Sequence, residues 1–260
     1  MKRSGTQSIE RAILLLKELS SRGSFGWRLS DLAQRCQMDV GTTHRILACL
    51  GKERLVHRRP SDRHYLPGPM LFELGLSQTA LLGFQAACAD PLRRIAAQYP
   101  AVVSVYMRSG ADCVCSGHVG SSPIKAVSTE VGTRRPLMAS AAGLAILIAL
   151  PKPEAKSLVA DNLRRVAHLG ATRVRALEKM FKNSAQLGYG IHDGEIVPGV
   201  SAFGVPIFGP DGSALASLGM SGDAATLPPS RADEFIASLK REAKKIMALS
   251  TKIQEAPPQA

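Results

Sequence analysis

Three side chains that could act as metal ligands or acid–base catalysts lie close together in the second half of the chain. His192, Asp193 and Glu195 fall within four residues, and imidazole and carboxylate groups perform both kinds of chemistry. No second motif supports a catalytic site, because the sequence contains no G-x-S-x-G, G-x-x-x-x-G-K-S/T or H-E-x-x-H pattern. We therefore interpret the segment as a polar loop and expect no catalytic residue and no metal ion.

Cysteine chemistry is a second candidate. A strand would place Cys113 and Cys115 on the same face, but two thiols are too few for a tetrahedral zinc site. The chain has five cysteines and no C-x-x-C pair, which disfavours both a zinc finger and a disulfide framework. We expect structural cysteines, and a redox switch at Cys113 and Cys115 is kept as an alternative.

A third candidate is the small-residue run Ala139–Gly143, which opens an apolar helix predicted over residues 137–150. A helix N-terminus offers free backbone N–H groups and the positive end of the helix dipole. Because the side chains here are small, a carboxylate could come close to these groups. The alternative is that small residues simply permit tight helix packing.

Cationic and small side chains share one face of a helix predicted over residues 40–52, which Asp39 would cap. At 100° per residue its buried arc holds Val40, Thr43, Ile46, Leu47 and Leu50. A short helix capped by Ser30 precedes it, so the two form a helix-turn-helix, whose second helix enters the major groove of DNA. The residues expected to face DNA on this helix are Gly41, Thr42, Thr43 and Arg45.

A basic hairpin is predicted directly after this helix. Residues 55–58 and 64–66 alternate as strands around a turn at residues 60–63, and residues 40–64 carry a net charge of +4. A basic stripe is often only a solvated face, but this order of helices, capped turn and basic wing favours DNA binding. We expect Arg58, Arg59 and Arg63 to contact phosphates.

The composition is that of globular domains, with 45% hydrophobic and 21% charged residues in a chain of 260 and a formal net charge of +12. The length favours two domains. The most apolar stretch, between Pro136 and Pro151, is shorter than the roughly 20 residues that cross a bilayer. The first residues lack the features of a cleavable signal peptide, so we expect no membrane partner and a cytoplasmic, nucleoid-associated protein.

The chain between the wing and the second domain is predicted to be helical. Met70–Leu82 is apolar enough for an inter-domain helix that needs a partner surface, and Asp90-Pro91 is a typical start for a new helix that ends at Tyr99. We assign residues 1–75 to a winged helix-turn-helix domain, 76–89 to a linker helix, 90–252 to a second domain and 253–260 to a disordered tail.

The second domain is predicted to be α+β, with helices beside an antiparallel sheet. Strands are expected at residues 102–108, 112–119, 124–127, 189–192, 201–208 and 214–220. Besides the helix at 137–150, helices are expected at residues 154–161 and 173–186 and from Ser230 onward.

The order of these motifs resembles the IclR family of bacterial transcriptional regulators over residues 8–250. Residues 8–14 (SIERAIL), 42–47 (TTHRIL) and 56–68 resemble the family's opening helix, recognition helix and wing. In the second half the resemblance rests on residues 131–137, the run Ala139–Gly143, Gly188-Tyr189 and Ser221-Gly222.

This resemblance implies that residues 90–252 form a GAF-like, oligomerising domain that binds a small-molecule effector, in a homodimer or homotetramer on palindromic promoter DNA. It implies a carboxylic acid effector, no other cofactor, and an effect on DNA affinity or on contacts with RNA polymerase. The pocket residues that it implies, together with Ser140 of the helix start, are Val127, Ser140, Ala141, Ala142, His192, Asp193, Ala202, Gly219 and Ser221.

The sequence departs from the family pattern at several pocket positions. Met138 and Leu144 replace a frequent histidine and lysine, and Ala202 and Gly219 stand where some members have a cysteine and a serine. We therefore expect a less polar pocket that prefers a bulkier or aromatic acid. The leading hypothesis is a ligand-responsive regulator of a metabolic operon, as repressor or activator; the alternatives are an enzyme or a redox sensor fused to a DNA-binding domain.

Overall fold

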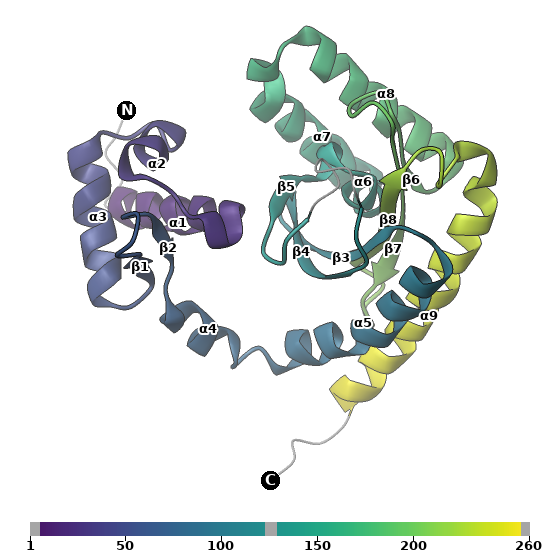
Figure 1. Ribbon diagram of the computed structural model, residues 1–260, viewed down its shortest axis with the longest axis horizontal. Helices are drawn as coiled ribbons and strands as arrows, with labels where there is room; N and C mark the ends of the chain where they lie inside the picture. Colours follow the sequence, from purple (N-terminus) through teal and green to yellow (C-terminus); the bar gives the residue numbers. More distant parts are fainter. Residues whose placement is uncertain (1–5, 123–128, 256–260) are drawn as a thin grey trace. The chain divides into compact units, whose positions relative to one another are not determined.

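The computed structural model describes residues 6–122 and 129–255, and the chain divides into two compact units, Met1–Thr79 and Ala80–Ala260 (Figure 1). The predicted strand at 124–127, and with it Val127, lies outside the described residues. None of the described helices is long and apolar enough to cross a membrane. Each unit has its own hydrophobic core.

The first unit is a winged helix-turn-helix, as predicted. Its elements are α1 (Gln7–Leu19), η1 (Ser20–Phe25), α2 (Leu29–Arg35), α3 (Val40–Lys52), β1 (Val56–Arg58), β2 (Tyr65–Pro67) and α4 (Pro69–Gly75). The core joins Leu15 and Leu19 of α1 to Leu32 of α2 and Leu47 of α3. The two wing strands pair antiparallel, and Tyr65 also bridges to Trp27, so the wing is attached to the segment that enters α2.

One cap in this unit was predicted correctly and one was not. Asp39 caps α3, because its carboxylate accepts the N–H of Thr42 at 2.7 Å. Ser30 does not cap α2, which already begins at Leu29, so the Ser30 hydroxyl lies inside the first turn and donates to Asp31. Val40 is 51% exposed rather than buried, since the part of α3 that enters the core begins at Thr43.

The boundary between the two helices that follow the wing lies at a different place from the predicted one. α4 ends at Gly75, where the Ser77 hydroxyl donates to the Leu74 carbonyl, and α5 (Thr79–Gln98) then continues through Pro91. The prediction of a new helix at Asp90-Pro91 was therefore wrong. A proline inside a helix removes one backbone hydrogen bond, and here Pro91 is buried with Leu92 in the core of the second unit.

The second unit is an α+β domain, which confirms the predicted fold class. Its further elements are β3 (Val102–Ser109), β4 (Asp112–Val119), β5 (Arg134–Pro136), η3 (Leu137–Ala139), α6 (Ala141–Ile148), α7 (Lys152–Val166), η4 (Ala167–Leu169), α8 (Ala171–Leu187), β6 (Gly190–Asp193), β7 (Val200–Phe208), β8 (Ala214–Asp223), η5 (Pro229–Arg231) and α9 (Ala232–Glu255). The antiparallel sheet has the order β5-β4-β3-β8-β7-β6. α9 continues to Glu255, into the segment predicted to be a disordered tail.

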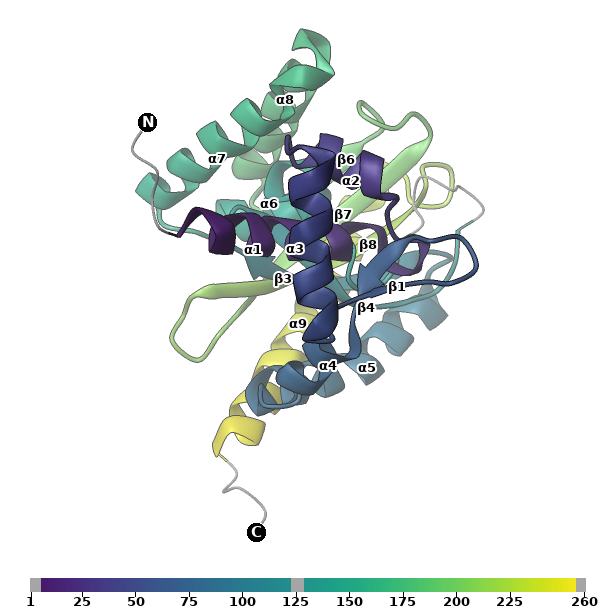
Figure 2. The ribbon, with the colours of Figure 1, turned by 90° about the vertical axis from the view of Figure 1, so that its left-hand side faces the viewer.

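Helices cover both faces of this sheet (Figures 1 and 2). On one face, Leu92 and Ile95 of α5 and Phe235 of α9 pack against β3, β7 and β8. On the other face, α6, α7 and α8 form a second core with Tyr106 and Cys113. α6 is the innermost of these helices, and all its residues from Ala141 to Leu147 are buried.

The start of α6 lies directly on three strands, because each strand has a glycine beneath it. A Cβ atom on Gly190 of β6 would lie 1.8 Å from the Ala141 carbonyl oxygen, and one on Gly204 of β7 would lie 2.7 Å from it. A Cβ on Gly219 of β8 would be 3.3 Å from that of Ala142. The three strand glycines are thus required by this packing, and so is Gly143 of α6, where a Cβ would lie 2.2 Å from the Leu137 carbonyl oxygen.

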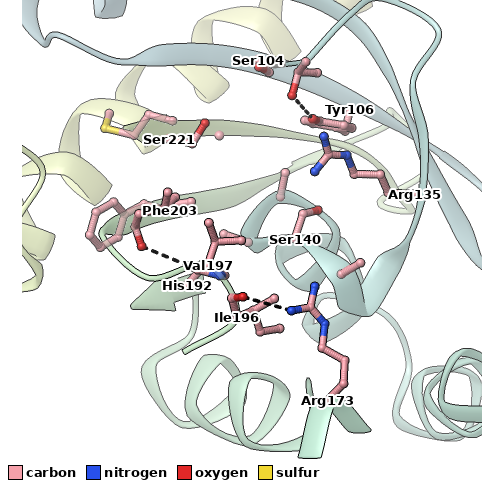
Figure 3. A pocket seen from close by; sticks show the side chains of 18 residues that line it. Ser104, Tyr106, Arg135, Ser140, Arg173, His192, Ile196, Val197, Phe203 and Ser221 are labelled. Carbon is pink, nitrogen blue, oxygen red and sulfur yellow. Dashed lines mark hydrogen bonds between the residues drawn. The ribbon is translucent and has the colours of Figure 1, made fainter. Parts of the chain in front are cut away.

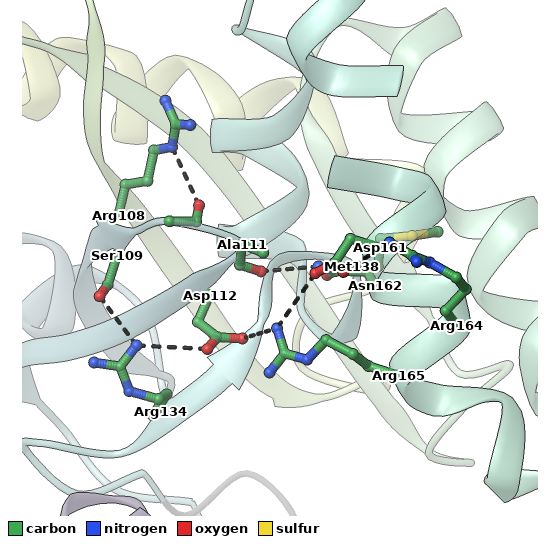
Figure 4. Close-up of polar contacts among 11 residues, drawn as sticks. Arg108, Ser109, Ala111, Asp112, Arg134, Met138, Asp161, Asn162, Arg164 and Arg165 are labelled. Carbon is green, nitrogen blue, oxygen red and sulfur yellow. Dashed lines mark hydrogen bonds and ion pairs between the residues drawn. The ribbon is translucent and has the colours of Figure 1, made fainter. Parts of the chain in front are cut away.

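Polar contacts hold the segment that leads into α6 (Figure 4). Asn162 of α7, which is fully buried, accepts the Met138 N–H at 3.0 Å and donates to the Ala111 carbonyl at 2.9 Å. Asp112 forms ion pairs with Arg134 of β5 and, at 2.8 Å, with Arg165 of α7. These contacts connect the β3–β4 turn, β5 and α7 at the entry to α6.

The glycine contacts predict a strong effect of a single methyl group. Gly190→Ala should lower the free energy of unfolding of the second unit by about 3 kcal/mol, because the sheet or α6 must shift. Gly117→Ala is the matched control, since a Cβ there makes only an ordinary contact, at 3.7 Å, with Leu92. Denaturant unfolding of both variants checks this, and equal midpoints would contradict it.

Candidate DNA interface and ligand pocket

The outer face of α3 presents Arg45 and Thr42 to solvent. Arg45 is exposed, and its Nη2 donates to the Thr42 hydroxyl at 3.1 Å. Gly41, one turn before Arg45, is also exposed and adds no side chain that would keep α3 from another surface. An exposed arginine near the N-terminus of a recognition helix can bind guanine with two hydrogen bonds.

Thr43 does not belong to this face, and its prediction as a DNA contact was wrong. The residue is 0% exposed, and its hydroxyl donates to the Asp39 carbonyl at 2.9 Å. Threonine fits an apolar core in this way because the backbone of the preceding turn accepts its one hydroxyl hydrogen.

The three wing arginines have different surroundings. The guanidinium of Arg59 donates to both carboxylate oxygens of Asp62 and to the carbonyls of Ser24 and Phe25. Arg59 therefore holds the wing turn to the end of η1, and since its side chain is 33% exposed, its contact with phosphate stays a prediction. The guanidinium carbon of Arg58 lies 5.3 Å from the centroid of the Tyr65 ring. Arg63 is exposed on the turn.

The second unit contains a pocket between the sheet and the start of α6 (Figure 3). The predicted residues that line it are Ser140, Ala141, Ala142, His192, Ala202, Gly219 and Ser221. Ile196, Val197 and Val200 form part of its apolar wall, whereas the side chains of Phe203 and Met220 point to the other face of the sheet, where Phe203 packs against Phe235 of α9.

Asp193 is not part of this pocket. Along β6 successive side chains point to opposite faces, so His192 faces the pocket while Asp193 is exposed. Glu195 pairs instead with Lys179 of α8. The three residues therefore do not converge, and in the described ranges no group of three His, Cys, Asp or Glu side chains could hold a metal ion.

Two arginines that the sequence did not single out also line the pocket. Arg135 follows Arg134 on β5, so the strand directs Arg134 toward Asp112 and Arg135 toward the pocket. Arg173 extends from α8 and donates to the Ile196 carbonyl at 3.0 Å. The pocket therefore contains two guanidinium groups that were not predicted from the sequence, and its polarity relative to the family pattern stays a prediction. Alternation on β5 could have suggested Arg135, but no local signal marks Arg173.

Burial affects the titration of two pocket side chains. Burial lowers the pKa of His192, whose Nδ1 lies 3.2 Å from the Val200 carbonyl and 3.3 Å from the Gly194 nitrogen. Its Nε2 has no hydrogen-bond partner among the described residues. Burial also raises the pKa of Tyr106 to about 12, and its hydroxyl lies 3.2 Å from that of Thr129. Tyr106 is therefore a neutral hydroxyl group at physiological pH.

Cys113 and Cys115 of β4 are buried in the core between the sheet and α6, α7 and α8. Burial raises their pKa values to about 12 and about 11, so both remain protonated thiols at neutral pH. Protonated, buried thiols react slowly with oxidants, which supports a structural role over a redox switch.

A winged helix-turn-helix and an α/β unit with a polar pocket define a ligand-responsive DNA-binding regulator. A family model described as IclR helix-turn-helix domain matches residues 8–60, and one described as bacterial transcriptional regulator IclR C-terminal matches residues 81–248. The chain belongs to the IclR family of bacterial transcriptional regulators.

Individual proteins agree with this assignment. The HTH-type transcriptional repressor AllR of Klebsiella pneumoniae is 26% identical over 87% of this chain and 84% of its own length. The fold is shared with an IclR transcriptional regulator from Alicyclobacillus acidocaldarius (TM-score 0.70, 23% identity, 95% of this chain and 100% of that one). It is also shared with an IclR homologue from Microbacterium hydrocarbonoxydans, crystallised with 4-hydroxybenzoate (TM-score 0.68, 19% identity, 94% and 99%).

The wing contacts predict that substitutions of Arg63 and Arg59 affect different properties. Arg63→Gln should weaken binding to all DNA sequences alike and reduce the slope of log affinity against log salt by about 1, because one phosphate contact is lost. Arg59→Gln should instead lower the thermal stability of the first unit, because it breaks the contacts with Asp62, Ser24 and Phe25. Salt titrations and thermal melts distinguish them; a reduced slope without a change in stability for Arg59→Gln would contradict this assignment.

The burial of His192 predicts a pH-dependent stability. The pKa of His192 lies below the ordinary value of 6.5, so the unfolded chain binds the proton more readily than the folded chain. The free energy of unfolding therefore decreases as the pH falls below about 6.5. His192→Gln should remove this component, because glutamine does not titrate. The melting temperature should therefore fall more steeply between about pH 6.5 and 5 in the wild type than in His192→Gln; parallel curves would argue against a buried, neutral imidazole.

Proposed function

We propose that the chain is a repressor that responds to a small organic acid, whose carboxylate binds where α6 begins. The observation that carries the proposal is the pocket itself: the two arginines Arg135 and Arg173 and the first turn of α6 line the same space. The first N–H groups of a helix have no acceptor within the helix, so Ala141 and Ala142 can donate to an anion there.

The rest of the pocket suits the carbon skeleton of such an acid. Ile196, Val197 and Val200 supply apolar surface in the pocket, and apolar walls with a few polar groups are typical of small-molecule sites. The crystallised Microbacterium homologue holds 4-hydroxybenzoate. This supports an aromatic or similarly bulky acid here, and the repressors among the relatives support repression.

The DNA partner is proposed to be a palindromic promoter site in the cytoplasm, bound by a homo-oligomer without catalytic activity. Exposed apolar side chains support oligomerisation: Phe72 is 70% exposed on α4, and Leu81 and Leu82 are exposed at the start of α5. Such side chains in succession favour a partner surface. Arg45, Thr42 and Gly41 would read base edges, and Arg58 and Arg63 would bind phosphates.

Fluorescence anisotropy of DNA from upstream of the neighbouring genes tests the proposal, with benzoate, 4-hydroxybenzoate, isophthalate and adipate as probes. At least one acid should change DNA affinity by about tenfold, equivalent to about 1.4 kcal/mol of coupling. Arg135→Gln should keep DNA binding and lose the response, whereas Arg45→Gln should lose specific DNA binding and still bind the acid.

Two results would contradict the proposal. If an acid binds and DNA affinity does not change, the pocket does not control DNA binding. If Arg135→Gln responds as the wild type does, the acid binds elsewhere.

A further inference from the structure

The two pocket arginines enter from different sides. Figure 3 shows the guanidinium of Arg135 beside Tyr106 and that of Arg173 beside Ile196, with Ser140 between them. Arg135 enters the pocket from β5, and Arg173 enters it from α8. The pocket therefore has two cationic ends rather than one cationic centre.

The charge of the lining matches a ligand with two negative groups. Among the described residues that line the pocket there are two guanidinium groups and no carboxylate. Asp193 and Glu195 follow His192 in sequence, but neither lines the pocket, and Glu195 pairs with Lys179. A guanidinium group binds a carboxylate through two parallel hydrogen bonds, so each end suits one carboxylate.

His192 adds an independent observation at the Arg173 end. The side chain is 6% exposed and lines the pocket, and its Nε2 has no hydrogen-bond partner among the described residues. When Nδ1 accepts the Gly194 N–H, Nε2 carries the ring hydrogen. A buried donor without a partner costs free energy, and a carboxylate oxygen that accepts from Nε2 would remove this cost. The Arg173 end of the pocket therefore contains an imidazole nitrogen that would have no hydrogen-bond partner against a purely apolar ligand tail.

We propose that the effector is a dicarboxylate, with one carboxylate at Arg135 and the start of α6 and the other at Arg173 and His192. This inference rests on the proposed function and specifies the ligand class for the same pocket. A monocarboxylic acid of equal length would place carbon or hydrogen against one guanidinium and the imidazole. Sites built for hydrogen bonding reject ligands that lack the matching group, because the buried polar groups are left unpaired.

Arg173 is a specificity residue in this proposal, although it also donates to the Ile196 carbonyl. Glutamine at this position can still donate a hydrogen bond but carries no charge, so Arg173→Gln tests the charge rather than the loop contact. Lys179→Gln is the matched control, because it removes one positive charge from the same helix at a residue that does not line the pocket.

Isothermal titration of the full-length protein with matched pairs of acids tests the proposal: isophthalate against benzoate, and adipate against hexanoate. The dicarboxylate of a pair should bind at least about tenfold more tightly, which corresponds to one charged hydrogen-bonded contact. Arg173→Gln should bind both members of the pair about equally, with benzoate affinity near that of the wild type. Lys179→Gln should keep the wild-type preference.

The outcomes separate this inference from the proposed function. Equal affinity for both members of each pair in the wild type would overturn the dicarboxylate proposal and leave an acid effector in place. Equal losses for benzoate and isophthalate in Arg173→Gln would overturn the role of Arg173 in specificity. If none of the four acids binds, the acid effector itself is overturned.

Discussion

The pocket depends on one steric constraint, the direct contact between the start of α6 and the sheet. Gly190, Gly204 and Gly219 leave no room for side chains between the strands and the helix. Because Ala141 and Ala142 rest on these glycines, the first N–H groups of α6 lie at the pocket floor, where a ligand can reach them. The tight packing and the proposed anion binding therefore both depend on the small residues at the start of α6.

Strand alternation then decides which polar residues reach the pocket. On β5, Arg134 pairs with Asp112 while Arg135 lines the pocket; on β6, Asp193 is exposed while His192 lines it. Arg134, with Asn162 of α7, holds the segment before α6 in place. α5 and α9 pack on the opposite face of the sheet, where Arg94 of α5 forms an ion pair with the buried Glu242 of α9. α5 is also the first helix of the chain after the DNA-binding unit.

Much of the fold could be predicted, because periodicity and turn residues report on it directly. Asp39, the wing turn and the alternating strands were recognised for this reason. The features that were missed depend on contacts between distant residues: burial against the core lets α5 continue through Pro91, and the Ser24 and Phe25 carbonyls accept hydrogen bonds from Arg59. Helix geometry correctly placed Thr43 on the buried arc, and only its inclusion among the DNA contacts was wrong. Arg173 was missed because only the fold brings α8 to the pocket.

A crystal structure of the full-length protein with isophthalate would test the central claim most directly. The account predicts one carboxylate within hydrogen-bond distance of the Ala141 and Ala142 nitrogens and of Arg135. It predicts the other carboxylate at Arg173 and His192 Nε2. A bound dicarboxylate that leaves the start of α6 untouched, or that binds outside this pocket, would contradict it.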